Sequence, residues 1–230
     1  MNDMWVLAPA PVSNWTLVAA TAPWCTRYGH AAVAMPDDSI VLMGGVAGDG
    51  RMQSLNDVWR WDSATGWQQM TAKAEWQTRS QFGAVALSDG TVVIMGGAGD
   101  VRADAWYNDT WKSSDGGATW TQLIPHHALP WSARWAFPAV VTPSDNVLLL
   151  GGFDGVSTVF NDVWLLAGVT ASAAAPTLTR LTAAAPWAPR AWFPAVVLSS
   201  QVLLMGGSNA KQWEPSAFYN DVWSMDLTSL

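Results

Sequence analysis

Charged residues are scarce in this chain of 230 residues: they make up 13% of it, about half of the ~25% found in an ordinary domain. The hydrophobic share is 50%, which indicates a folded protein and excludes a disordered tail. The sequence contains no run of lysine or arginine, and its net charge is −7. Such a chain repels phosphate backbones, so we expect no nucleic acid among its partners.

The sequence has one cysteine, Cys25, which excludes an intrachain disulfide framework and leaves the cellular compartment undecided. No apolar run approaches the roughly 18 residues of a membrane span. The first residues lack the positively charged segment of a signal peptide, so we expect no secretory leader. The expected location is the cytoplasm if Met1 is the true start, and the same start also suits a segment of a longer protein.

Tryptophan is abundant, with 17 residues, and most of them fall in a unit that recurs four times. The third copy, WSARWAFPAVVTPSDNVLLLGGFDGVSTVFNDVW, runs from Trp131 to Trp164. Each copy contains WxxR, an apolar run that ends in Gly-Gly, a variable loop and NDxW. The glycine pairs begin at Gly44, Gly96, Gly151 and Gly206, so the periods are 52, 55 and 55 residues. A constant period near fifty residues indicates a repeat architecture.

Each copy is predicted to form four short antiparallel strands. In the first copy, two apolar runs (27–34 and 39–43) flank a turn, a third strand passes through Trp59, and a fourth begins at Trp67. A sheet of this kind exposes two apolar faces, so neighbouring sheets must cover them. We therefore expect tryptophans to fill the interfaces between sheets. These are the NDxW tryptophans and the fourth-strand tryptophans, namely Trp5, Trp59, Trp111, Trp164, Trp223, Trp15, Trp67 and Trp120.

These features together resemble the kelch repeat: a unit of about fifty residues, a Gly-Gly that closes an apolar strand, tryptophans on the outer strands and an arginine opening the inner strand. SSDGGATW, from Ser113 to Trp120, also resembles the Asp-box turn. The resemblance implies an all-β fold, a β-propeller of four-stranded antiparallel blades arranged about a channel. It implies a single domain, 1–230, with blade repeats at 24–67, 76–122, 131–181 and 187–230, preceded by 1–17.

Two arrangements of the four repeats fit the strand count. In the first, a small closed ring, the strand at Trp15 completes the blade begun at Trp187. In the second, the repeats are a slice of a larger propeller, or a ring that another chain completes.

Loops of variable length lie on one face of the predicted propeller, which we call the loop face. The start of each first strand lies on the same face. The loops are 46–55, 98–107, 153–160 and 208–219. Loop variation on a fixed scaffold is typical of binding sites. Arginines edged by aromatic rings can hold a carboxylate-bearing peptide or stack a sugar. The candidate binding residues are Arg27, Arg79, Arg134, Arg190, Trp106, Trp135, Trp192 and Trp213. The alternative is that the repeated arginines tie blades together through backbone carbonyls.

Candidates for catalysis are few, namely Cys25, Tyr28, His30, His126 and His127. They match no ligand motif of galactose oxidase, a kelch-type copper enzyme, and the three tyrosines give little support for a sialidase-like site. We expect no catalytic residue, metal or cofactor, and predict a noncatalytic module that binds a protein segment or glycan at the loop face or acts as a scaffold. A glycan-directed, oxidase-like or sialidase-like enzyme stays open. So does a structural subunit of a larger assembly, formed by self-association or with a partner chain.

Overall fold

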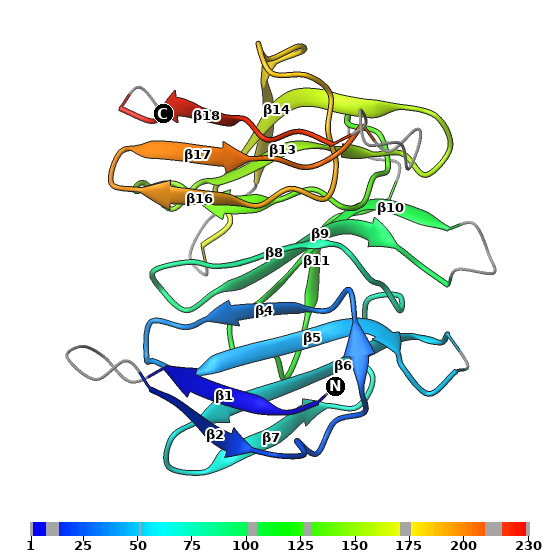
Figure 1. Ribbon diagram of the computed structural model, residues 1–230, viewed down its shortest axis with the longest axis vertical. Coiled ribbons are helices and arrows are strands. Elements are labelled where there is room, and N and C mark those ends of the chain that lie inside the picture. Colours follow the sequence, from blue (N-terminus) through cyan, green and yellow to red (C-terminus); the bar gives the residue numbers. More distant parts are fainter. Residues whose placement is uncertain are drawn as a thin grey trace.

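The computed structural model describes residues 2–7, 14–50, 52–100, 105–126, 130–170, 176–209 and 218–228. The regular structure in these ranges consists of strands, as the predicted all-β fold requires. No helix in the described part of the chain is long and apolar enough to cross a membrane. Figure 1 shows the sheets following one another along the long axis, with β1 and β2 at one end and β16 to β18 at the other.

Four antiparallel sheets form the blades. In three of them the strands lie side by side in sequence order, and in the first the two innermost segments both pair with the same neighbouring strand. The first blade contains β3 (Arg27–Tyr28), β4 (Ala31–Ala34), β5 (Ile40–Ala47), β6 (Ser54–Asp62) and β7 (Gly66–Thr71). The second contains β8 (Gly83–Ala86), β9 (Val92–Ala98), β10 (Trp106–Ser113) and β11 (Thr121–Ile124). The third contains β12 (Ala139–Val141), β13 (Val147–Phe153), β14 (Val159–Ala167) and β15 (Thr177–Thr182). The fourth contains β16 (Ala195–Leu198), β17 (Gln201–Met205) and β18 (Val222–Asp226).

The inner strands β4, β8, β12 and β16 pack against one another in that order, so the blades are arranged radially as the kelch resemblance implies. Between the inner strand and the next, the chain reverses in a tight turn with one residue at positive φ. These residues are Asp38, Gly90, Asp145 and Ser199, at φ 64°, 82°, 56° and 56°. Asp, Ser and Gly are the residue types that such turns favour.

The Gly-Gly pair is needed where each blade meets the next. Gly96 has φ +60°, and a Cβ built on it would lie 2.9 Å from the carbonyl oxygen of Arg134 in the following blade. Gly44 and Gly151 make equally close approaches to Arg79 and Arg190, at 2.8 and 2.9 Å. Only glycine combines a left-handed conformation with such an approach of two backbones.

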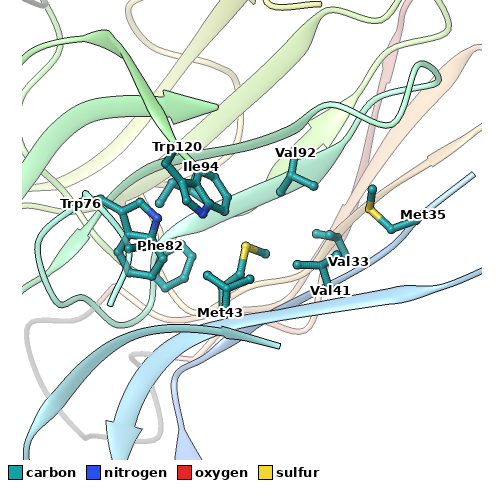
Figure 2. Packing of buried hydrophobic residues seen from close by; sticks show 11 residues of the cluster. Val33, Met35, Val41, Met43, Trp76, Phe82, Val92, Ile94 and Trp120 are labelled. Carbon is teal, nitrogen blue, oxygen red and sulfur yellow. The ribbon is translucent and has the colours of Figure 1, made fainter. Parts of the chain in front are cut away.

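Apolar side chains fill the space between adjacent blades. Figure 2 shows the first interface, where Val41 and Met43 of the first blade face Trp76, Ile94 and Trp120 of the second. The Trp76 and Trp120 rings meet edge to face, with centroids 5.8 Å apart. The interfaces between the second and third blades and between the third and fourth repeat this composition. The predicted interface role is confirmed for Trp111, Trp120, Trp164 and Trp223.

The N-terminal strands depart from that expectation. β1 (Met4–Leu7) and β2 (Trp15–Ala19) pair with each other in a separate two-stranded sheet. Trp5 and Trp15 are 50% and 65% exposed, because no described segment packs on their face of this β1–β2 hairpin. β2 therefore does not complete the fourth blade within its own chain, and β18 pairs with β17 alone among the described strands.

The Asp-box segment forms the turn between β10 and β11. The Asp115 carboxylate accepts hydrogen bonds from the hydroxyls of Ser113 and Thr119, at 2.7 and 2.6 Å, and from the backbone amides of Ala118 and Thr119. Burial alone would raise the pKa of Asp115, but these hydrogen bonds lower it below its ordinary value. The motif therefore closes a turn by local hydrogen bonds.

Candidate functional site

The four WxxR arginines are buried inside their own blades. Each guanidinium faces the aspartate of the NDxW motif in the same blade, with Nη1–Oδ1 distances of 2.5 to 2.8 Å; the pairs are Arg27–Asp57, Arg79–Asp109, Arg134–Asp162 and Arg190–Asp221. The Nη1 of each arginine also donates to the carbonyl of the first glycine of the Gly-Gly pair, at 2.8 to 2.9 Å. Two-point pairing of this kind fixes both position and orientation of the guanidinium.

Aromatic rings enclose these arginines. The Arg79 guanidinium carbon lies 4.5 Å from the centroid of Tyr107, and that of Arg134 lies 3.7 Å from the centroid of Phe160. Both arginines are at most 1% exposed. The geometry supports a structural role for the arginines, since hydrogen bonds and rings within the protein already surround the guanidinium groups, but these bonds lie within each blade and not between blades as the alternative required. Direct contact of these groups with a ligand stays a prediction.

The pairing with arginine lowers the pKa of Asp109 and of Asp221. Burial alone would raise the pKa of Asp109, but hydrogen bonds from Arg79 and its positive charge hold it below the ordinary value. Hydrogen bonds from Arg190 are the main cause of the strongly lowered pKa of Asp221. Each aspartate also accepts a bond from the indole Nε1 of its NDxW tryptophan, as at Trp111 with 2.8 Å.

A ladder of backbone hydrogen bonds joins the blades two residues after each arginine. The N–H of Gln81 donates to the carbonyl of Gly29, that of Ala136 to Gln81, and that of Trp192 to Ala136, at 2.7, 2.9 and 2.9 Å. All four residues have positive φ, between 52° and 62°. Three of them are not glycine, and such conformations in L residues cluster at functional sites. The ladder gives this part of the molecule a rigid frame.

Aromatic residues from the third and fourth blades form a cluster beside this frame. The Trp135 and Trp192 rings meet edge to face, with centroids 5.1 Å apart and an interplanar angle of 90°. Phe153 lies within 5.9 Å of Trp135 and 6.3 Å of Trp192. The indole Nε1 of Trp192 donates to the side-chain oxygen of Gln81 at 2.7 Å. The cluster is thus held in place from the second, third and fourth blades.

Two hollows flank the aromatic cluster. The first, of about 260 Å³, is lined by Tyr28, Gln81, Asp100, Trp106 and Trp135. The second, of about 370 Å³, is lined by Trp192, Gly207, Ser208, Phe218 and Tyr219. Trp192 and Phe218 are 38% and 52% exposed. The surface therefore offers aromatic faces together with amide, carboxylate and hydroxyl groups.

The structure brings together Trp106, Trp135 and Trp192, three of the tryptophans that the sequence singled out at the loop face. The fourth, Trp213, lies outside the described residues. Sequence reasoning did not identify Gln81 or Phe153 as part of the site. Gln81 occupies the same repeat position as Trp192, two residues after the arginine, and the variation at this position was the available signal.

One of the residues considered for catalysis, His126, contacts the second blade. The His126 and Tyr107 rings form a T-shaped contact, with centroids 5.9 Å apart. The His126 Nδ1 accepts a hydrogen bond from the backbone amide of Asn108 at 3.3 Å. His127 lies outside the described residues. In the described ranges, no three residues of the metal-binding types His, Cys, Asp and Glu are grouped so that they could hold an ion. The Asp154 carboxylate accepts three backbone amides, from Val156, Ser157 and Thr158, and so closes its own loop.

Comparison with known proteins agrees with the fold. A family model described as the Kelch motif matches residues 26–66, within which most of the first blade lies. The solved structure of YjhT is similar, with a TM-score of 0.74 and 14% identity over 91% of this chain and 67% of that one. The flagellar outer arm dynein alpha chain of Chlamydomonas reinhardtii is 26% identical over 146 residues, 62% of this chain. The chain spans 3% of the length of that dynein chain.

Proposed function

The chain is a kelch-repeat β-propeller, and from that premise we propose that it is a noncatalytic binding module whose loop face holds a segment of another protein. The observation that carries the proposal is the gathering of Trp106, Trp135 and Trp192 around two hollows. These tryptophans come from three different blades and do not belong to the repeat pattern. Residues required only by the blade architecture recur in every copy, so these tryptophans need another reason for their position.

The physical properties of the cluster suit recognition of a polypeptide. Tryptophan supplies a large apolar contact area with few rotatable bonds, and it is enriched among the residues that dominate binding energy. Gln81 and the backbone ladder fix the orientation of Trp192. A site that is already ordered loses less conformational entropy when a partner binds.

The negative charge of the chain indicates which kind of protein segment would bind at the loop face. The net charge is −7, and the exposed Asp100 lines the first hollow beside Trp106. A lysine or arginine side chain that enters this hollow gains attraction from both the carboxylate and the aromatic face. The partner is therefore a segment with a basic residue next to an apolar one.

The dynein relative offers support of a different kind. Its name describes an alpha chain of dynein from the flagellar outer arm. Similarity over 146 residues to part of such a chain favours a role in protein association over one in small-molecule chemistry.

The test uses a displayed library of random peptides selected on the immobilised chain. For the selected peptides we expect Trp135→Ala and Trp192→Ala each to lower the affinity by roughly tenfold or more, the effect of losing an aromatic anchor. Trp61→Ala is the matched control, because Trp61 is also outside the repeat pattern but lies at the end of β6 and lines neither hollow.

Two outcomes would count against the proposal. Selected peptides that bind both cluster variants as tightly as the original chain would place the site elsewhere. A glycan array that gives binding sensitive to Trp135→Ala, with no peptide selected, would favour the glycan-directed alternative instead.

A further inference from the structure

An apolar cavity of about 220 Å³ lies between the third and fourth blades, lined by Leu150, Val163, Trp187, Val202, Leu204 and Trp223. The corresponding place between the first and second blades is filled by Trp120, which packs with Val58, Trp76, Val92 and Ile94. Trp187 occupies the same WxxR position as Trp76, and Val163 the same position within NDxW as Val58. The cavity is thus the place where the indole of a fourth-strand tryptophan would lie.

The strand that would carry such an indole is missing from the fourth blade as described. β6, β10 and β14 each pair on their outer edge with a fourth strand. β18 pairs only with β17 among the described strands. An open edge of this kind is a template for a further strand.

In the other blades, certain hydrogen-bond donors contact the blade that follows. The corresponding donors of the fourth blade make no such contact within the described ranges. Asn56 donates to the carbonyls of Ala74 and Trp76 in the next crossover. Asn220, at the same repeat position, is exposed and makes no such bond within the described ranges. The amide of Gly45 donates to the carbonyl of Arg79 in the next blade, but the amide of Gly207 finds no equivalent carbonyl among the described residues.

The matching strand is present at the other end of the same chain. In β2, Trp15 lies opposite Leu7, as Trp67 lies opposite Trp61 in the first blade, so Trp15 is a fourth-strand tryptophan. It is 65% exposed, and its neighbour Leu17 is 42% exposed. A two-stranded hairpin on its own is of marginal stability in water, so β2 is available for exchange.

β1 and β18 carry the same NDxW motif and are alternative third strands for β2. Asp221 in the β18 copy is paired with Arg190. Asp3 in the β1 copy accepts a bond from the Trp5 indole at 2.9 Å, and the described part of the chain offers it no arginine. β18, which belongs to a blade with its arginine in place, is therefore the better partner for β2.

We propose that β2 of a second copy of this chain adds to β18 as the fourth strand of the fourth blade, with its Trp15 in the cavity beside Trp187. The first blade of the donor then follows the fourth blade of the acceptor. The carbonyls of Ala22 and Trp24, which Asn2 binds in the single chain, become acceptors for Asn220. Reciprocal exchange between two copies joins eight blades, within the range known for propellers.

A second copy of this chain would supply the missing strand, because the chain carries both the open strand edge and a strand that fits it. The acceptor is the β18 edge with its cavity, and the donor is a fourth strand followed directly by a crossover and a WxxR blade. The register follows from the first blade, where Arg60 faces Gln68 and Trp59 faces Gln69. Thr16 is therefore placed opposite Ser224, and Leu17 opposite Trp223.

The experiment is a disulfide cross-link between chains. Two variants, Thr16→Cys and Ser224→Cys, are made in a Cys25→Ser background, coexpressed and mildly oxidised. We expect a covalently linked pair of chains on a nonreducing gel, and for the original chain a solution mass of twice 24.7 kDa. Adding Trp15→Ala to the Thr16→Cys variant lowers the yield of linked pairs by roughly tenfold, since the anchor is lost.

Gln201→Cys in place of Ser224→Cys is the matched control, because Gln201 is also exposed but lies on β17, one strand away from the open edge. We expect no linked pair from this control. The proposal is overturned by equal linking in the control, by no linked pair from the coexpressed variants, or by a Thr16→Cys/Ser224→Cys double variant that links only within one chain. It is also overturned if the original chain is a monomer in solution.

Discussion

The Arg79 guanidinium and the Asp109 carboxylate meet in a two-point contact, with Nη1–Oδ1 2.8 Å and Nη2–Oδ2 2.9 Å. The same contact occurs in each of the other three blades. It connects the start of the inner strand to the third strand of the same blade, and the carbonyl of Arg79 in turn accepts the amide of Gly45 in the preceding blade. An ion pair therefore stabilises each blade internally, and backbone hydrogen bonds join it to its neighbour.

Removal of one carboxylate tests the structural role of this pair. We expect Asp109→Ala to lower the free energy of unfolding by about 3 to 5 kcal/mol, because it leaves a buried guanidinium without its counter-charge. Chemical denaturation followed by fluorescence measures the change. The matched control is Asp3→Ala, which removes the aspartate of the same motif where it faces no described arginine, and we expect it to change stability little. Equal losses in the two variants would contradict the account.

The lowered pKa of Asp221 gives the chain a defined response to acid. Hydrogen bonds from Arg190 favour the ionised carboxylate in the folded state, while an aspartate in the unfolded chain titrates near pH ~3.9. The stabilisation is therefore fully present above about pH 4 and is lost as the pH falls toward the folded pKa. We expect the stability difference between the original chain and Asp221→Asn, measured by urea unfolding, to shrink below about pH 4. A difference that grows on acidification would show the opposite sign.

The first glycine of the Gly-Gly pair lies against the next blade at Gly96 but meets only its own blade at Gly206. Gly96→Ala places a Cβ 2.9 Å from the Arg134 carbonyl at φ +60°, and we expect a loss of roughly 1 to 3 kcal/mol. Gly206→Ala meets only the Tyr219 carbonyl, at 3.2 Å and φ +58°, so its loss should be smaller. Thermal unfolding of the two variants, as single chains at low concentration, measures the difference. A larger loss at Gly206 would contradict the assignment of an open interface to the fourth blade.

The repeat pattern predicted most of the fold. It predicted the all-β class, the antiparallel blades and the interface role of tryptophans such as Trp111 and Trp120, because each of these follows from periodicity and residue size. Sequence alone did not predict the pairing of Arg79 with Asp109, since these two residues are 30 positions apart and become adjacent only when the third strand returns across the blade.

The candidate site was predicted only in part. Trp135 and Trp192 stood out because they break the repeat, but their contact with each other depends on the angle between the third and fourth blades. The bond from Trp192 to Gln81 spans 111 residues, and no local pattern encodes it. The exposure of Trp5 and Trp15 was also unpredicted, because the motif shows that a strand is built for an interface and not whether a neighbouring blade covers it.

The proposed partner segment contacts the loop-face tryptophans and not the repeated ones. The most direct test is a nuclear magnetic resonance titration of the ¹⁵N-labelled chain with a selected peptide, observing the indole N–H resonances. We expect shifts for Trp106, Trp135 and Trp192, with Trp76, Trp131 and Trp187 unchanged. Shifts confined to the WxxR tryptophans, or none at the loop face on binding, would contradict the proposal.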